Sequence, residues 1–422
     1  MDRRDFLRLC GLAGVAVSAP FLPSRVCAQE GYDGILYLIV HASGGWDPTS
    51  FCDPKGSPDP DAPTPINHYL RDDIRSPSGP SPIRWAPFAD NDAFFERHYR
   101  DILVFNGIDT STNSHAVGPR HIHSGVLTEG HPAFAALVAA HRRRASPMAF
   151  ITNGGYDITR GIVSRTRVGN VNAIQRIAQP DLLSITNEVP YHTPTTQERI
   201  HAAQRARLER LRDKQHLPHL DRSITEVVLS RDPSEASLRA LTEYLPDLNA
   251  LNTTLGRQGA LAIAAWRAGI CVSANLSVGG FDTHGNHDTN QANALRGLTQ
   301  GITEVWNQAE EAGIADRVMM VVGSDFGRTP GYNEGNGKDH WSITSMFMMG
   351  AGVRGNRVIG VSDDTHRALT LDPQSLERSE GGVILRPVHI QNALRDAAGV
   401  TGSDLARTYP IANERLAGLE IG

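Results

Sequence analysis

Short apolar runs recur along the chain, and each one leads into a polar loop that contains glycine. The first run covers residues 34–41 and is followed by the sequence Gly44-Gly45-Trp46-Asp47. Runs of this length with many β-branched residues are typical of strands that are buried on both faces of a sheet. The further runs of this kind are Ile102–Phe105, Met148–Thr152, Ala274–Val278, Arg317–Val322 and Met346–Met349.

Segments with the apolar spacing of helices lie between several of these runs. This alternation predicts the α/β fold class, with a mostly parallel central sheet and helices on both faces. Ligands of such sheets bind beyond the carboxyl ends of the strands, so we expect the polar loops to meet at one edge. The predicted helices are Ala133–Arg144, Thr196–Lys214, Ser234–Tyr244, Arg257–Ala268 and Thr289–Ala312.

The stretch from about residue 190 to 255 interrupts the alternation. It is charged and helical in pattern, and we interpret it as a helical insertion in a single domain that spans residues 29–422. A solvated helix pair that packs on one face of the sheet explains the same pattern equally well. The proline-rich segment 53–87 is predicted to be a long ordered loop.

Residues 1–28 have the order of a secretory signal: a basic front, an apolar middle and a small residue, Ala28, at the exit. The pair Arg3-Arg4 is typical of a twin-arginine signal. A membrane anchor is the alternative, but the apolar stretch is shorter than the roughly 20 residues that span a bilayer. We therefore expect a mature protein that begins at Gln29, is exported by the twin-arginine translocase to the periplasm or another extracytoplasmic compartment, and has no stable membrane span.

The composition narrows the choice of partners. The chain has 41 Lys and Arg against 46 Asp and Glu, a net charge of −5, so a nucleic-acid partner is not expected. Neither a Gly-x-Gly-x-x-Gly motif after the first run nor a Gly-x-Ser-x-Gly motif occurs, which disfavours dinucleotide binding and an α/β-hydrolase site.

The predicted mature part keeps Cys52 and Cys271, and the sequence leaves open whether they form a disulfide.

Aspartates and histidines follow four of the predicted strand ends. Carboxylate oxygens and neutral imidazoles are ligands of divalent metal ions, and loops at one sheet edge can bring them together from distant parts of the chain. Taken one at a time, each residue has a structural alternative, as a turn former, a helix cap or a hydrogen-bonded histidine. The candidates are Asp47, Asp282, His284, His287, Asp325 and His340.

Several motifs occur together in a characteristic order: the twin-arginine start, Gly44–Asp47, Gly280–His284, Ser324–Thr329 and Lys338–His340. As a set they resemble the DUF1501 family, which is itself similar to the alkaline phosphatase and sulfatase superfamily. The resemblance implies an alkaline phosphatase-like fold and a metal-dependent hydrolase of phosphate or sulfate esters, with a small anionic ester as its substrate. A non-catalytic binding or assembly protein that retains this fold is the alternative.

The resemblance also implies a first metal site. Asp282, His284 and His340 match the histidine-rich site of the superfamily, which holds zinc. His287 is an alternate ligand, because the usual four-residue spacing after the aspartate falls on Asn286 in this chain.

A second, carboxylate-rich site is implied at Asp47 and Asp325. The superfamily often has a histidine directly after the late aspartate, whereas this chain has Phe326. Without that imidazole, the site would favour calcium, magnesium or manganese, or hold no ion.

By its position after the second strand, Ser114 is the candidate nucleophile, with Thr112 as the next choice. The alternative for Ser114 is that it only caps the following helix. His115, His121 and His123 lie in the same segment, and a hydrogen-bonded role at the surface is favoured over metal ligation for the last two.

Two cations flank the candidate metal ligands. The planar guanidinium of Arg328 suits the oxygens of phosphate or sulfate, and Lys338 offers a point charge. Arg328 is the stronger candidate because it follows Asp325 by three residues. Surface solvation is the alternative for both side chains.

Overall fold

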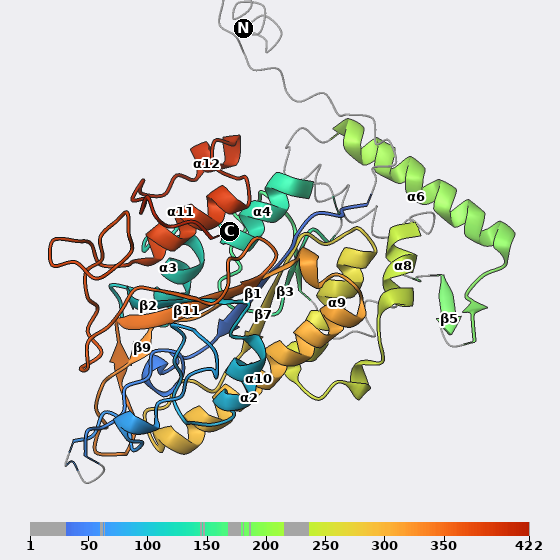
Figure 1. Ribbon diagram of the computed structural model, residues 1–422. Coiled ribbons are helices and arrows are strands. Elements are labelled where there is room, and N and C mark those ends of the chain that lie inside the picture. Colours follow the sequence, from blue (N-terminus) through green and yellow to red (C-terminus); the bar gives the residue numbers. More distant parts are fainter. Residues whose placement is uncertain are drawn as a thin grey trace, which may run out of the picture. The chain divides into compact units, whose positions relative to one another are not determined.

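A central sheet of eight strands organises the computed structural model, in the order β12-β2-β11-β8-β1-β7-β3-β4 (Figure 1). Strand β11 runs antiparallel to both of its neighbours, and the other pairs in this sheet are parallel. The bounds are β1 Leu36–Ala42, β2 Ile102–Asp109, β3 Phe150–Thr152, β4 Arg165–Arg167, β7 Ser273–Val278, β8 Val318–Ser324, β11 Ile343–Gly350 and β12 Arg357–Ile359.

The structure describes residues 31–421, apart from 60–61, 63, 144–145, 147, 168–178, 180, 185–186 and 215–235. The predicted signal peptide, residues 1–28, lies outside the described residues. Within the described part, no helix is both long and apolar enough to cross a membrane. Cys52 and Cys271 are buried, and both are free thiols.

Helices cover both faces of the sheet. Helices α2, α9 and α10 contribute to the hydrophobic core on one face, and α3, α4 and α11 contribute to the core on the other face. The helix bounds are α2 Asn91–His98, α3 Gly118–Ser124, α4 Phe134–Arg143, α6 Pro194–Lys214, α8 Ala236–Tyr244, α9 Thr254–Arg267, α10 His287–Glu311, α11 Pro387–Ala397 and α12 Asp404–Thr408.

The predicted α/β class and all six predicted strands are confirmed, because each apolar run forms one strand of the central sheet. The five predicted helices correspond to α4, α6, α8, α9 and α10. The main strands are buried along almost their whole length, which explains why they read as continuous apolar runs and not as alternating ones.

Shorter elements complete the fold. The stretch interpreted as a helical insertion contains α6, α8 and part of α9, and residues 215–235 within it are outside the described part. The described residues of 53–87 form a loop that holds only a short 3-10 helix, Arg71–Asp73, and isolated bridges. Two small pairs of strands lie outside the central sheet: β5 Leu182–Ser184 with β6 Val189–Pro190, and β9 Gly327–Arg328 with β10 His340–Trp341.

Candidate functional site

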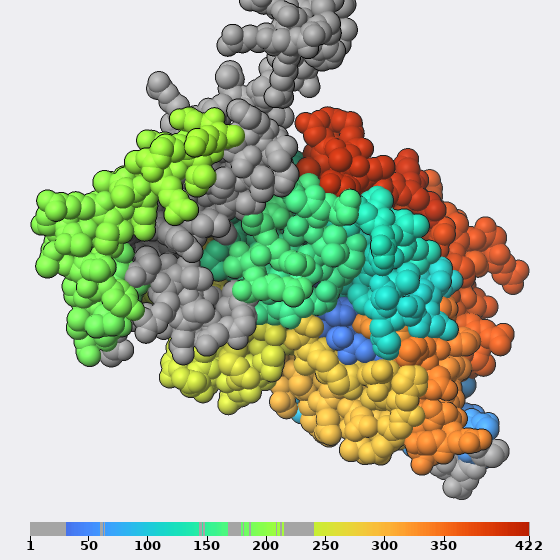
Figure 2. All heavy atoms as spheres, turned by 180° about the vertical axis from the view of Figure 1, so that it is seen from behind, coloured from blue at the N-terminus to red at the C-terminus, as the bar shows by residue number. Residues whose placement is uncertain are grey.

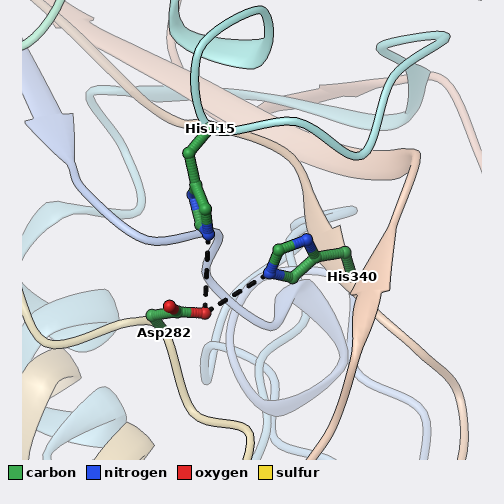
Figure 3. Close-up of side chains that lie close together, drawn as sticks. All are labelled: His115, Asp282 and His340. Atoms are coloured by element: carbon green, nitrogen blue, oxygen red, sulfur yellow. Dashed lines mark hydrogen bonds and ion pairs between the residues drawn. The ribbon is translucent and has the colours of Figure 1, made fainter.

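Three side chains from separate loops converge beyond the carboxyl ends of the central strands. His115 follows β2, Asp282 follows β7, and His340 begins β10. One ligand atom from each lies within 4.8 Å of the others, and Figure 3 shows both imidazoles directed at the Asp282 carboxylate. Loops far apart in the sequence therefore meet here, as the parallel sheet predicts.

His284 joins these three residues, and we call the four together the histidine cluster. Its Nε2 lies 3.1 Å from Asp282 Oδ1 and 2.9 Å from His340 Nε2. The Nε2 atoms of His340 and His115 lie 3.4 and 3.6 Å from the same carboxylate oxygen. Three imidazole nitrogens thus gather around one oxygen.

The other ring nitrogen of each histidine has a hydrogen-bond acceptor. Nδ1 of His115 lies 2.6 Å from Asp325 Oδ2, and Nδ1 of His284 lies 2.8 Å from Asp339 Oδ1. Nδ1 of His340 lies 2.8 Å from the carbonyl oxygen of Asn113. Carbonyl and carboxylate oxygens only accept, so each Nδ1 carries a proton and donates it.

With Nδ1 protonated, the lone pairs of the neutral imidazoles lie on Nε2 and face one another. Two such lone pairs 2.9 Å apart, in His284 and His340, repel unless a cation lies between them. Imidazole nitrogens and a carboxylate, with second nitrogens held by outer partners, are the donor set and support that zinc uses in proteins. Burial lowers the pKa of His340, which favours the neutral form that binds a metal. The ligand atoms of His115, Asp282 and His340 lie close enough together to share a zinc-type ion, and His284 lies beside them.

Asp325 lies behind the histidine cluster and is almost fully buried. Its Oδ1 accepts from His41 Nε2 at 3.0 Å and from the Gly44 amide at 3.3 Å. Burial opposes ionisation of Asp325, but its hydrogen bonds and charge interactions with His41 and His115 outweigh burial and lower its pKa. Asp325 is therefore an anion that orients His115.

Glycine is required where the backbone comes close to the cluster. Gly44 has a φ of +119°, and a Cβ on it would lie 2.5 Å from the backbone nitrogen of Asp282. No other residue allows the turn after β1 to approach both carboxylates so closely.

A pocket of about 540 Å³ opens beside these groups. Figure 2 shows the corresponding face, where the blue early segment is visible in a hollow between cyan, green and orange segments. The pocket is lined by His41, Ser43, Gly44, His115, Ala116, Pro119, Gly155, Tyr156, Gly279, Gly280, Asp282 and Asp325. The pocket thus gives a small molecule access to His115 and Asp282.

Asp47 is not part of this cluster, contrary to the expectation that it shares a site with Asp325. Its Oδ2 accepts from Lys338 Nζ at 2.7 Å and from His287 Nε2 at 3.1 Å, and all three side chains are fully buried. Burial opposes ionisation of Asp47, but the charge of Lys338 and the bond from His287 hold its pKa far below the usual range. Asp47, Lys338 and His287 therefore satisfy one another, which leaves Lys338 unable to reach an ester in the pocket.

Arg328 also differs from expectation, because its guanidinium is fully buried. Nε donates to the Gly45 carbonyl at 2.8 Å, Nη1 to the Lys338 carbonyl at 3.0 Å, and Nη2 to the Gly44 carbonyl and to Asp282 Oδ1, the latter at 2.7 Å. The side chain that was predicted to bind substrate instead holds a metal-ligand candidate in place. Its donors are occupied by backbone oxygens and Asp282.

Phe326 lies where the superfamily pattern has a histidine. Its buried ring packs at centroid distances of 4.9 Å from His115 and 4.5 Å from His340. It forms an apolar support for two imidazoles and offers no ligand atom.

Ser114 is exposed and is not among the residues that line the pocket. Its hydroxyl accepts from the Ala116 amide at 3.3 Å, in the turn before α3, and the hydroxyl of Thr112 accepts from the Ser114 amide at 3.2 Å. These bonds belong to the turn before α3. The N-cap of α3 is Val117, and no side chain caps this helix, so the capping role that was the alternative for Ser114 is not seen.

The sequence reasoning missed three contributors to the site: His115 as a candidate ligand, Asp339 as the partner of His284, and His41 as the partner of Asp325. His41 is the penultimate residue of β1, and its position at a strand end was the available signal. His121 and His123 are hydrogen-bonded, to the Thr110 carbonyl and to His41 respectively, as expected, but both are buried and do not lie at the surface.

The family described as "Protein of unknown function (DUF1501)" matches residues 36–378 of the chain. No curated protein matches it significantly. Among solved structures, the chain is similar to the alkaline phosphatase from the Antarctic bacterium TAB5, with 10% identity, a TM-score of 0.37 and coverage of 88% of this chain and 99% of that chain. It is also similar to the lipoteichoic acid synthase LtaP from Listeria monocytogenes, with 10% identity, a TM-score of 0.37 and coverage of 92% and 75%. A third similar structure is BT1596, a 2-O GAG sulfatase, with 9% identity, a TM-score of 0.34 and coverage of 92% and 75%.

Proposed function

This chain belongs to the DUF1501 family, and we propose that it is a metal-dependent hydrolase of phosphate or sulfate esters. One observation carries the proposal: three imidazole Nε2 atoms surround the Asp282 carboxylate while each Nδ1 is held by an outer acceptor. The open pocket beside His115 and Asp282 gives a substrate access to this point.

His115, Asp282, His284 and His340 would hold the ion. A divalent ion there would act as a Lewis acid on an oxygen of the ester and neutralise its negative charge. Zinc is the ion that this donor set favours. The second, carboxylate-rich ion site with calcium, magnesium or manganese is not proposed, because Asp47 is bonded to Lys338 and His287.

The surrounding residues orient the candidate ligands, and one of them also lines the pocket. Asp325 keeps the proton of His115 on Nδ1, and Asp339 does the same for His284. Arg328 fixes the carboxylate of Asp282 from the buried side. His41 lines the pocket and orients Asp325, and both of its ring nitrogens are occupied, Nε2 by Asp325 and Nδ1 by His123.

The proposed activity is tested with zinc-loaded protein and two substrates, an aryl phosphate and an aryl sulfate. We expect turnover of at least one, and its loss by about 100-fold or more in Asp282→Ala, since a first ligand is removed. Asp316→Ala removes an exposed aspartate elsewhere and should retain full activity.

Two other results are informative. Zinc bound at this cluster without turnover of either ester would favour the alternative, a binding or assembly protein that keeps the fold. A chain that neither binds metal nor hydrolyses either ester would refute the proposal.

We also propose that the protein acts outside the cytoplasm, in the periplasm or a similar compartment. The support is the twin-arginine pattern of residues 1–28. This route carries proteins in the folded state, which suits a site assembled from three separate segments of the chain.

A further inference from the structure

Lys338 and Asp47 form an ion pair with no exposure to solvent, next to the histidine cluster. Lys338 Nζ donates to Asp47 Oδ2 at 2.7 Å, to Asn67 Oδ1 at 2.9 Å and to Thr49 Oγ1 at 3.3 Å. An ammonium group has three protons, and all three have an acceptor here. The buried cation is therefore fully satisfied.

Asp47 is equally satisfied. Its Oδ1 accepts from the amide and the hydroxyl of Thr49, at 2.9 and 2.6 Å, and its Oδ2 accepts from Lys338 and from His287 Nε2. A buried ion pair seldom stabilises a fold more than apolar side chains of the same volume would. Stability alone therefore does not explain this ion pair, and we look for a role in fixing the positions of the neighbouring loops.

Both partners of Asp47, His287 and Lys338, lie close in the chain or in space to candidate metal ligands. His287 Nδ1 contacts the hydroxyl of Thr283 at 2.7 Å, and Thr283 lies between Asp282 and His284 in the chain. On the other side, Lys338 precedes His340 by two residues. The loop after β7 and the loop before β10 therefore share one buried anchor.

The two loops are also joined directly through the backbone. The amide of Lys338 donates to the Thr283 carbonyl at 3.1 Å. The Lys338 carbonyl accepts from Arg328 Nη1, and Nη2 of the same guanidinium donates to Asp282 Oδ1. A shift of Lys338 would thus reach Asp282, His284 and His340 together.

We propose that the buried network of Lys338, Asp47 and His287 is a positioning device for the metal site. It holds the ligand-bearing loops in register before an ion binds, so the site's affinity for the ion depends on it. This inference rests on the proposed metal site. The three residues touch neither the ion nor the substrate.

The first test compares zinc affinity in the wild type and in the double variant Asp47→Leu, Lys338→Met, measured by competition with a chromophoric chelator. Apolar replacement of both partners avoids leaving an unpaired buried charge, so the double variant should still fold. Its melting temperature should be lower than that of the wild type, because His287, Thr49 and Asn67 each lose a buried hydrogen-bond partner. Its zinc affinity should fall by about 10-fold or more, the size of effect seen when outer partners of metal ligands are removed. Wild-type affinity in the folded double variant would overturn the proposal.

A milder pair of variants keeps the question decidable if the double variant does not fold. Thr283→Val removes the contact between the network and the ligand-bearing loop. Thr299→Val is the matched control, since Thr299 is also buried and its hydroxyl makes a comparable hydrogen bond, to the Leu295 carbonyl at 2.9 Å, within α10. Zinc affinity should weaken about 10-fold in Thr283→Val and stay within about twofold of wild type in Thr299→Val.

Equal weakening in both threonine variants would show a general effect of destabilisation and would overturn the positioning role. The wild type supplies the separate test of the metal site. If it binds zinc but Thr283→Val binds equally well, only the positioning proposal fails. If the wild type binds no zinc, the proposed function fails and the positioning role falls with it.

Discussion

At the scale of single residues, the protonation of three imidazoles decides what the site can do. Each Nδ1 of His115, His284 and His340 donates a hydrogen bond to an acceptor oxygen. The lone pair of each Nε2 is then free to bind an ion beside Asp282. Two of these acceptors are carboxylates, which also increase the electron density of the ring. Asp325 and Asp339 would therefore support the proposed metal site through His115 and His284, without contacting the ion themselves.

Replacing Asp325 by asparagine tests this claim. The amide oxygen can still accept from His115, but the negative charge is lost, so zinc affinity should fall by about 10- to 100-fold. Chelator competition measures the change, and Asp316→Asn at an exposed position should leave affinity unaltered. Unchanged affinity in Asp325→Asn would mean that the carboxylate does not support the ligand.

The acid stability of the protein should reflect Asp47. Because its pKa is held below the ordinary value of 3.8, its contribution to the free energy of unfolding is complete above that pH and is lost as the pH falls further. Melting temperatures measured from about pH 5 to pH 3 should decline less steeply in Asp47→Leu, Lys338→Met than in the wild type. Parallel declines would show that Asp47 does not make this contribution.

Residue roles were the hardest feature to infer from sequence. Asp282, His284 and His340 were identified, and the structure brings them together. Asp47, Arg328 and Lys338 are also charged residues at or near strand ends, but they are buried and bonded to protein groups. Charge and position along the chain do not distinguish a side chain that faces a pocket from one that packs beneath it.

At the scale of elements, the loop between β9 and β10 has little freedom where it passes the cluster. A Cβ on Gly337 would lie 1.9 Å from the carbonyl oxygen of His284, whereas a Cβ on Gly331 in the same loop meets nothing within 4 Å. Gly337 is therefore needed where the loop that leads to His340 passes close to the loop that carries His284.

Gly337→Ala should therefore displace the backbone of His284. We expect a loss of about 1–3 kcal/mol in the free energy of unfolding, as for other overpacked positions, together with weaker zinc binding. Gly331→Ala is the matched control and should change neither quantity. Denaturant unfolding and chelator competition measure both, and wild-type behaviour of Gly337→Ala would contradict the close packing seen here.

The central strands were predictable because burial on both faces makes each one a continuous apolar run. The small β9–β10 pair was not, since two-residue strands carry no periodic pattern. Yet this pair places His340 and Arg328 opposite each other, and both contact Asp282. The short irregular elements therefore determine which side chains meet at the site, and the long strands form the sheet from which the site loops extend.

At the scale of the whole chain, the sheet explains why distant residues meet. Strands β1, β7 and β8 are parallel neighbours, so the loops that carry Gly44, Asp282 and Asp325 leave the sheet at the same edge. This meeting was predicted from the alternation of strands and helices alone. Three imidazoles lie within 3 to 4 Å of one carboxylate oxygen of Asp282. This closeness depends on loop conformations that the alternation of strands and helices does not specify.

Export can be tested on the full chain. In Arg3→Lys, Arg4→Lys the charge of the N-terminal segment is kept but the twin-arginine pair is removed. We expect the variant to accumulate in the cytoplasm in uncleaved form, detected by fractionation and by intact mass. Unimpaired processing and export would contradict a twin-arginine route.

The position of a bound metal ion tests the central claim most directly. Crystals of zinc-loaded protein, measured on both sides of the zinc absorption edge, locate the ion by its anomalous signal. We predict one strong peak at about 2.0–2.2 Å from Asp282 Oδ1 and from the Nε2 atoms of the cluster histidines. A strong peak elsewhere, or no peak at this cluster in fully loaded protein, would contradict the account.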